Sequence, residues 1–217
     1  MKTRKYVKLV GDFETTVYEN QTFTEVWASA VVEIGTENVL IFNSINQTYQ
    51  YLASFDENVM IYYHNLKFDG IFWLNYLLKQ NFKQAYNTIS EEPFVVEWQR
   101  EKFMTNKSFK YAISHLGQFY NIVIKDNNHI IEIRDSLKLL PFSVKRIGES
   151  FGTKHKKLDM IYEGYRYAGC EITEKEKEYI ANDVLVVSEA LEIMFSEGHD
   201  KLTIGSCCLD EFRRTFF

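Results

Sequence analysis

Two carboxylates lie one residue apart in an otherwise apolar strand, in the stretch VGDFETT at residues 10–16. Successive side chains of a strand point to opposite faces, so Asp12 and Glu14 share one face. Like charges this close repel, and each raises the pKa of the other. The fold must therefore supply a positive charge beside them, and a divalent cation is the simplest one. A strand end open to solvent is the alternative that this motif alone leaves open.

The composition restricts the kind of metal. Of the 217 residues, 46% are hydrophobic and 16% aromatic, which suits a sizeable core and is too apolar for a disordered chain. The cysteines Cys170, Cys207 and Cys208 form no C-x-x-C pair, and the five histidines show no ligand spacing. We therefore expect neither a disulfide framework nor a zinc site. A metal held by carboxylates is Mg²⁺ or Mn²⁺.

Charge and hydropathy exclude two further classes of protein. The net charge of −5 argues against binding of duplex DNA over a broad surface. A local basic stretch at 145–157 can still meet phosphate, although a solvated loop fits most of its lysines. No apolar run approaches the roughly 20 residues that span a bilayer. The N-terminus also lacks the pattern of a signal peptide, so we expect a cytoplasmic protein with no membrane partner.

The spacing of apolar residues predicts an α/β chain. Strands are expected at 5–13, 24–33 and 38–43, forming a meander, then a short helix at 46–55 and a buried parallel strand at 58–64. The next helix, after residue 66, has five residues at helical spacing: Phe68, Ile71, Phe72, Asn75 and Leu78.

Hairpins are expected within 94–134, and a helix at 142–151 that Gly152 ends. Residues 173–198 give the strongest helix signal, because Thr173 followed by Glu176 is a capping-box pattern and Gly198 is a stop. The apolar stripe of this helix is Ile180, Val184, Val187, Leu191 and Met194.

Two more acidic residues occupy suggestive places. Asp69 follows the buried strand, at the edge where open α/β sheets place their sites, although Asn65 or Asp69 can also simply cap the helix. Tyr179 and Asp183 lie four residues apart on the long helix and share a face. Asp183 stands next to the apolar stripe, where a tolerated edge position is the alternative.

Taken in order, these segments resemble the three motifs of the proofreading exonuclease of family B DNA polymerases. The motifs D-x-E, N-x₂₋₃-F/Y-D and Y-x₃-D match Asp12–Glu14, Asn65–Asp69 and Tyr179–Asp183. The stretches DFETT, HNLKFDG, DSLKLLPFSVK and YIANDVLVVSEAL are similar to the protein-primed polymerases of small tailed bacteriophages. Lys157-Leu158-Asp159-Met160 matches a K-x-x-hydrophobic motif of that subfamily, and the resemblance covers essentially all 217 residues.

The resemblance implies one RNase H-like (DnaQ-like) exonuclease domain over residues 1–217, a mixed sheet flanked by helices. Its expected activity is removal of nucleotides from single-stranded or mismatched DNA 3′ ends, with release of 5′-mononucleotides. Such polymerases continue for several hundred residues, so we expect an N-terminal part of a longer DNA polymerase, acting in the host cytoplasm. The polymerase carboxylates are not found, and a stand-alone nuclease is the alternative.

The resemblance also assigns roles. Two Mg²⁺ or Mn²⁺ ions would activate water, neutralise the phosphorane and stabilise the leaving 3′-oxygen. Tyr179 would orient the attacking water, and Lys157 would contact the phosphate as a point charge. The ions are assigned to four carboxylates, with the first as the bridge: Asp12, Glu14, Asp69 and Asp183.

The expected substrate is a single-stranded DNA 3′ end. Stacking tolerates any base, so the action should not depend on sequence. Core packing is the alternative for the aromatic residues, above all Phe72. The stacking or wedging residues implied by the resemblance are Tyr62, His64, Phe68, Phe72 and Tyr162, and the further DNA contacts are Thr15, Asn65, Ser136 and Leu137.

Two other functions compete with this interpretation. A domain of the same fold can grip single-stranded DNA or a terminal priming protein without cutting. A ribonuclease is the second, because discrimination at the 2′-OH depends on pocket shape. The expected protein partners are the polymerase domain and the terminal priming protein.

Overall fold

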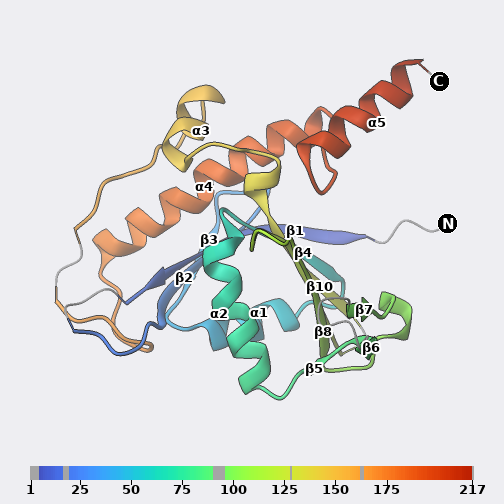
Figure 1. Ribbon diagram of the computed structural model, residues 1–217. Helices are drawn as coiled ribbons and strands as arrows, with labels where there is room; N and C mark the ends of the chain where they lie inside the picture. The colour runs from blue at the N-terminus through green and yellow to red at the C-terminus, as the bar shows by residue number, and fades with distance from the viewer. Residues whose placement is uncertain (1–4, 17–19, 90–95, 128, 162–163, 217) are drawn as a thin grey trace.

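A computed structural model describes residues 5–16, 20–89, 96–127, 129–161 and 164–216. Its centre is an eight-stranded mixed sheet in the order β3-β2-β1-β4-β10-β9-β8-β5 (Figure 1). A separate two-stranded ribbon is formed by β6 and β7. The strands are β1 (Tyr6–Thr15), β2 (Val26–Glu33), β3 (Val39–Phe42), β4 (Asn58–Tyr63), β5 (Lys83–Gln84), β6 (Tyr86–Ile89), β7 (Val96–Trp98), β8 (Ser108–Ile113), β9 (Phe119–Asp126) and β10 (His129–Asp135).

The predicted meander and parallel strand are confirmed. β2 pairs antiparallel with β1 and with β3. β4 lies between β1 and β10 and is parallel to both. β8, β9 and β10 form the expected hairpins. Because β1, β4 and β10 run the same way, their carboxyl ends meet at one edge of the sheet.

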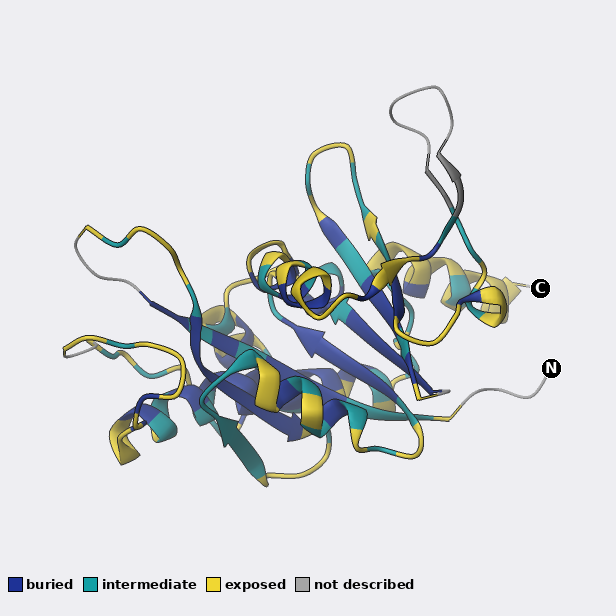
Figure 2. Cartoon of the chain, turned by 90° about the horizontal axis from the view of Figure 1, so that it is seen from below, coloured by how far each residue is buried: buried dark blue, intermediate teal, exposed yellow. Residues whose placement is uncertain are grey.

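Helices cover both faces of the sheet, and the buried strands lie between them (Figures 1 and 2). On one face, α1 (Ile45–Ala53) and α2 (Leu66–Lys79) share a core with Leu9 and Phe13 of β1. On the other, α3 (Val144–Ser150) and α4 (Glu174–Ser196) share a core with Val10. The alternation along β1 therefore assigns Asp12 and Glu14, which share the face of Val10, to the side of α4.

The long helix α4 forms as the sequence predicts. The hydroxyl of Thr173 accepts from the backbone N–H of Glu176, whose carboxylate accepts from the N–H of Thr173. Gly198 follows the helix with φ of +86°, a conformation that favours glycine. All five residues of the predicted apolar stripe are buried: Ile180, Val184, Val187, Leu191 and Met194.

The predicted apolar face of α2 is wrong. Phe68, Ile71 and Leu78 are 49%, 59% and 54% exposed, and the opposite face packs on the sheet through Trp73 and Leu77. The helix carries apolar residues on both sides, so spacing alone cannot choose between them. Tertiary packing against the sheet decides which side of α2 is buried.

A last helix, α5 (Ile204–Phe216), was not predicted. Its start has a local signal, because the hydroxyl of Thr203 accepts from the N–H of Ser206 at 3.2 Å. It buries Cys207 and exposes Phe212. All three cysteines are free thiols. Within the described ranges, no helix is both long and apolar enough to cross a membrane.

Candidate active site

The carboxyl end of β1 extends beyond its parallel neighbour. The pairing of β1 with β4 ends at Val10 and Tyr62. Further along, β1 pairs only with β2, where Asp12 and Glu14 lie opposite Ala30 and Ala28. The two carboxylates are intermediate in burial, and helix α2, which follows β4, packs on the opposite face of the sheet.

Helix α4 brings a third carboxylate to this edge. Asp183 is 6% exposed and lies on the buried stripe that packs on the face of Val10. One oxygen from each of Asp12, Glu14 and Asp183 lies within 4.8 Å of the others. The structure therefore brings together three of the four acidic residues that the motifs single out.

The fourth, Asp69, lies in the first turn of α2 and is 3% exposed. The start of this helix is held by Asp135, at the carboxyl end of β10. Its Oδ1 accepts from the backbone N–H groups of Asn65 at 3.1 Å, Leu66 at 3.2 Å and Leu137 at 3.0 Å. Asn65 stands at the N-cap position with φ of +70°, and its side chain makes no capping hydrogen bond.

Burial and mutual repulsion perturb these carboxyl groups. The pKa of Asp12 is raised well above its usual range, first by burial and then by the charges of Asp69, Glu14 and Asp183, while Lys157 opposes the rise. Burial also raises the pKa of Asp69, with Glu14 adding to the rise. Glu14 thus raises the pKa of Asp12 as the sequence predicts, and added positive charge would lower it again.

Lys157 supplies one positive charge from the segment between α3 and α4. Its ammonium donates to the carboxylate of Asp183 and, over 3.3 Å, to the hydroxyl of Tyr179. Burial alone would lower the pKa of Lys157, but the bond to Asp183 raises it. In the same way, burial raises the pKa of Asp183 and Lys157 opposes the rise. Lys157, Tyr179 and Asp183 thus form one hydrogen-bonded unit.

A cavity of about 200 Å³ adjoins this unit, with Asp12, His64, Lys157 and Asp183 among its lining residues. The ring of His64 is fixed on both sides. Its Nε2 donates to the backbone oxygen of Phe142 at 2.7 Å, and its Nδ1 lies 3.0 Å from the hydroxyl of Ser136. Burial lowers the pKa of His64, which favours the neutral ring in the cavity wall.

The residues expected to contact DNA differ in their exposure to solvent. Asn65 and Phe68 are exposed beside the site, and Phe72 is half-buried with its ring 5.6 Å from that of Phe68. His64 and Leu137 are partly buried, and Thr15 is 8% exposed. Tyr162 lies outside the described residues.

Two of these residues are buried. Tyr62 is 1% exposed, and its ring packs 5.6 Å from that of Phe195. Ser136 is 0% exposed, and its hydroxyl lies 3.1 Å from the backbone oxygen of Tyr63. Both side chains have internal partners, and their contact with DNA stays a prediction.

A family model described as DNA polymerase type B, organellar and viral, matches residues 53–169. This chain belongs to that family. The DNA polymerase of Bacillus phage Nf is 37% identical over 93% of this chain and 33% of its own length, and that of Bacillus phage phi29 is 34% identical over the same shares. The chain thus spans about a third of the length of the curated relatives that it matches.

The fold is shared with a solved member of the family. The phi29 DNA polymerase complexed with single-stranded DNA matches with a TM-score of 0.78 and 31% identity, over 96% of this chain and 34% of that one. This match confirms the RNase H-like α/β fold that the sequence predicts. The resemblance to phage family B polymerases is confirmed as well.

Sequence reasoning missed two residues that shape the site of this family B chain. Asp135 ties the ends of β4 and β10 together, and the only local signal is an acidic residue before the short 3₁₀-helix Ser136–Lys138. Gly11 leaves room for Tyr63, because a Cβ at position 11 would lie 2.8 Å from its ring. The sequence signal for Gly11 is its position inside a strand, where a glycine often marks the close approach of another part of the protein.

Proposed function

We propose that this chain is the 3′–5′ exonuclease domain of a family B DNA polymerase and that residues 1–217 form one such domain. The observation that carries the proposal is the cluster of Asp12, Glu14 and Asp183, with Asp69 acting on Asp12 beside it. Acidic side chains this close together serve no structural need, and Asp69, Glu14 and Asp183 raise the pKa of Asp12. Such a cluster is the donor set that hard divalent cations prefer.

The residues fit two divalent cations, Mg²⁺ or Mn²⁺. All donors are carboxylates, and Oδ1 of Asp69 and Oδ1 of Asp183 are buried without a hydrogen-bond partner among the described residues. A buried, unpaired carboxylate oxygen is costly unless a cation meets it. When bound, such ions supply a hydroxide-like nucleophile and neutralise charge on the phosphate.

The remaining polar groups of the chain then have distinct tasks. The hydroxyl of Tyr179 lies one helical turn before Asp183 and can hold the attacking water by a hydrogen bond. The side chain of Lys157 is 32% exposed, so its ammonium can turn from Asp183 toward a phosphate oxygen. As a compact point charge it offsets the negative charge that develops during cleavage.

The proposed substrate is the 3′ end of single-stranded DNA. Phe68 and Asn65 present an exposed aromatic ring and amide at the start of α2, and a solved relative is complexed with single-stranded DNA. In the full-length protein we expect the polymerase domain and a terminal priming protein as partners, and the host cytoplasm as the place of action.

A product ladder tests the proposal. A 5′-labelled single strand, incubated with Mg²⁺ or Mn²⁺, should shorten stepwise from the 3′ end and release 5′-mononucleotides. Asp12→Asn and Asp183→Asn should lose this activity, while Asp159→Asn, on an exposed residue of the same loop as Lys157, should keep it. Internal cuts from the outset, or activity that survives EDTA, would contradict the proposal. Binding without any cleavage would favour the non-cutting module.

A further inference from the structure

A pair of exposed tyrosines lies on the segment that leads into α4. The rings of Tyr165 and Tyr167 are stacked, with centroids 5.6 Å apart and planes inclined by 28°. They are 54% and 48% exposed. Two large aromatic side chains at the surface serve the core little, and their flat faces suit a planar ligand.

The residue between them is an anchor. Arg166 points inward, where its Nε donates to the carboxylate of Glu176 at 2.7 Å and its Nη2 donates to the same oxygen. Its guanidinium lies over the ring of Trp27, 5.5 Å from the centroid. Arg166 is therefore neutralised and held against the protein, while the tyrosines on either side of it are exposed.

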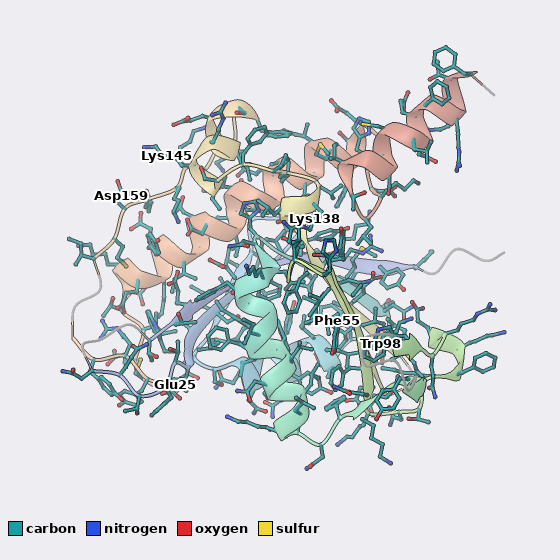
Figure 3. All side chains as sticks on the ribbon, viewed as in Figure 1. Glu25, Phe55, Trp98, Lys138, Lys145 and Asp159 are labelled. Atoms are coloured by element: carbon teal, nitrogen blue, oxygen red, sulfur yellow. The ribbon has the colours of Figure 1, made fainter. Side chains whose placement is uncertain are left out.

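The backbone on either side is also fixed. Gly164 and Gly169 have φ of +76° and +89°. The N–H of Ala168 donates to the carboxylate of Glu25 at 3.2 Å, and that of Gly169 donates to the backbone oxygen of Asn43 at 2.9 Å. In Figure 1 this orange segment runs beside the blue start of β2, and Glu25 is labelled in Figure 3. A pair held in place before binding loses little entropy when a ligand stacks on it.

The platform lies close to the carboxylates. Trp27, whose ring lies under Arg166, is followed in the chain by Ala28, which pairs with Glu14. The register between β1 and β2 shifts directly after Glu14. Along α4, Glu176 precedes Asp183 by seven residues, which is about 10 Å of helix. That distance is about three stacked nucleotides at 3.4 Å each.

We propose that Tyr165 and Tyr167 form a stacking platform for bases of the single strand whose 3′ end lies at the carboxylates. This inference rests on the proposed function and adds a second contact region to it. Within the described residues 164–169 the cation is Arg166, which is already paired with Glu176, so the contribution of the platform is stacking, which depends little on salt and on base identity. Very short substrates should not reach it.

Equilibrium binding tests the platform independently of cleavage. The probe is a fluorescein-labelled oligothymidylate decanucleotide in EDTA, read by anisotropy. The double variant Tyr165→Ala/Tyr167→Ala should bind about tenfold more weakly, because base–aromatic stacking is lost. Tyr165→Phe/Tyr167→Phe keeps both rings and should bind as the wild type does. Phe103→Ala removes a 62% exposed ring remote from this segment and should change nothing.

Three further readouts separate stacking from other effects. The fold loss should be the same at low and high salt, and equal melting temperatures should show that the variant is folded. In Mn²⁺, the alanine variant should raise KM for the decanucleotide with kcat unchanged and leave a dinucleotide unaffected. Unchanged decanucleotide affinity in the alanine variant overturns the platform, whereas absence of cleavage by the wild type overturns only the proposed function.

Discussion

Lys157 and Asp183 form an ion pair inside the carboxylate cluster, and the same ammonium donates to Tyr179 at 3.3 Å. The positive charge that the acidic strand end requires thus comes partly from the chain itself. Lys157 opposes the elevated pKa of both Asp12 and Asp183. A group that already offsets negative charge in the free site is well placed to do so when a phosphate enters.

Lys157→Ala should therefore slow cleavage by about a hundredfold, the scale seen when one stabilising donor is removed from a developing negative charge. Affinity for Mn²⁺ should not fall, because Lys157 competes with cations for Asp183. Single-turnover rates and calorimetric Mn²⁺ titration check the two statements. Lys145→Ala, in the same basic stretch but fully at the surface, is the control and should behave as the wild type does. Loss of Mn²⁺ binding in Lys157→Ala would mean that the role is misassigned.

The acidic cluster also makes stability depend on pH. A carboxyl group whose folded pKa is raised favours the folded state less as pH climbs above its unfolded value, about 3.9 for Asp. The pKa of Asp12 is raised well above the usual range by burial and by its acidic neighbours. In EDTA at pH 8, Asp12→Asn should thus melt at a higher temperature than the wild type, and the difference should shrink toward pH 4.

Saturating Mn²⁺ should reverse that order. Binding stabilises the wild type by roughly 2.7 kcal/mol at a hundredfold excess over Kd, and the variant loses most of this gain. Thermal melting of both proteins, with EDTA and then with Mn²⁺, makes the comparison. Asp159→Asn changes an exposed carboxylate outside the cluster and should follow the wild type in both conditions. If Asp12→Asn is the less stable protein in EDTA and Mn²⁺ shifts both melts equally, Asp12 has a structural role only.

Asp135 offers a test of how the site is held. Its Oδ1 accepts from three backbone N–H groups, those of Asn65, Leu66 and Leu137. Asp135→Ala leaves these buried and partly buried donors without that acceptor, which should destabilise the fold by about 3 kcal/mol. Asp135→Asn keeps one acceptor oxygen and should lose less. Urea unfolding of both variants measures the loss of folding free energy. Equal losses would show that the charge of Asp135, rather than its role as a hydrogen-bond acceptor, stabilises the fold.

The parts of the site that sequence reasoning predicted have local causes. The capping box at Thr173 and Glu176 and the apolar stripe of α4 fix that helix without reference to the sheet. The alternation along β1 then places Asp12 and Glu14 on one face. Parallel pairing brings the end of β4 to the same edge, so the three motifs meet although they are far apart in the sequence.

The parts that could not be predicted depend on tertiary contacts. Helix α2 is apolar on both sides, and only packing against Phe13 and Tyr63 turns Trp73 inward. The burial of Tyr62 follows from α4 and Phe195 above it, which no spacing reveals. Asp135 accepts hydrogen bonds from the backbone of Asn65 and Leu66, which are distant from it in the sequence. No sequence motif predicts such an acceptor.

Gly11 supplies the last test, because its missing side chain sets the position of its neighbour Asp12. A Cβ at position 11 would lie 2.8 Å from Cζ of Tyr63 and 2.9 Å from its hydroxyl. Tyr63 is 0% exposed and packs against Phe13 at 5.0 Å, so it has no room to withdraw. Gly11→Ala should therefore destabilise the fold by about 1–3 kcal/mol, as overpacked cores do.

Cleavage by Gly11→Ala should slow as well, because any shift of β1 relieving the clash also moves Asp12. The matched control is Gly205→Ala in the first turn of α5, where the nearest atom to a new Cβ is 4.0 Å away. There alanine should be neutral or stabilise by up to about 1 kcal/mol, since it favours helix. Urea unfolding and single-turnover rates of both variants give the comparison. Wild-type stability and rate in Gly11→Ala would show that Tyr63 moves aside, and the close approach of β1 and Tyr63 would then not be what positions Asp12.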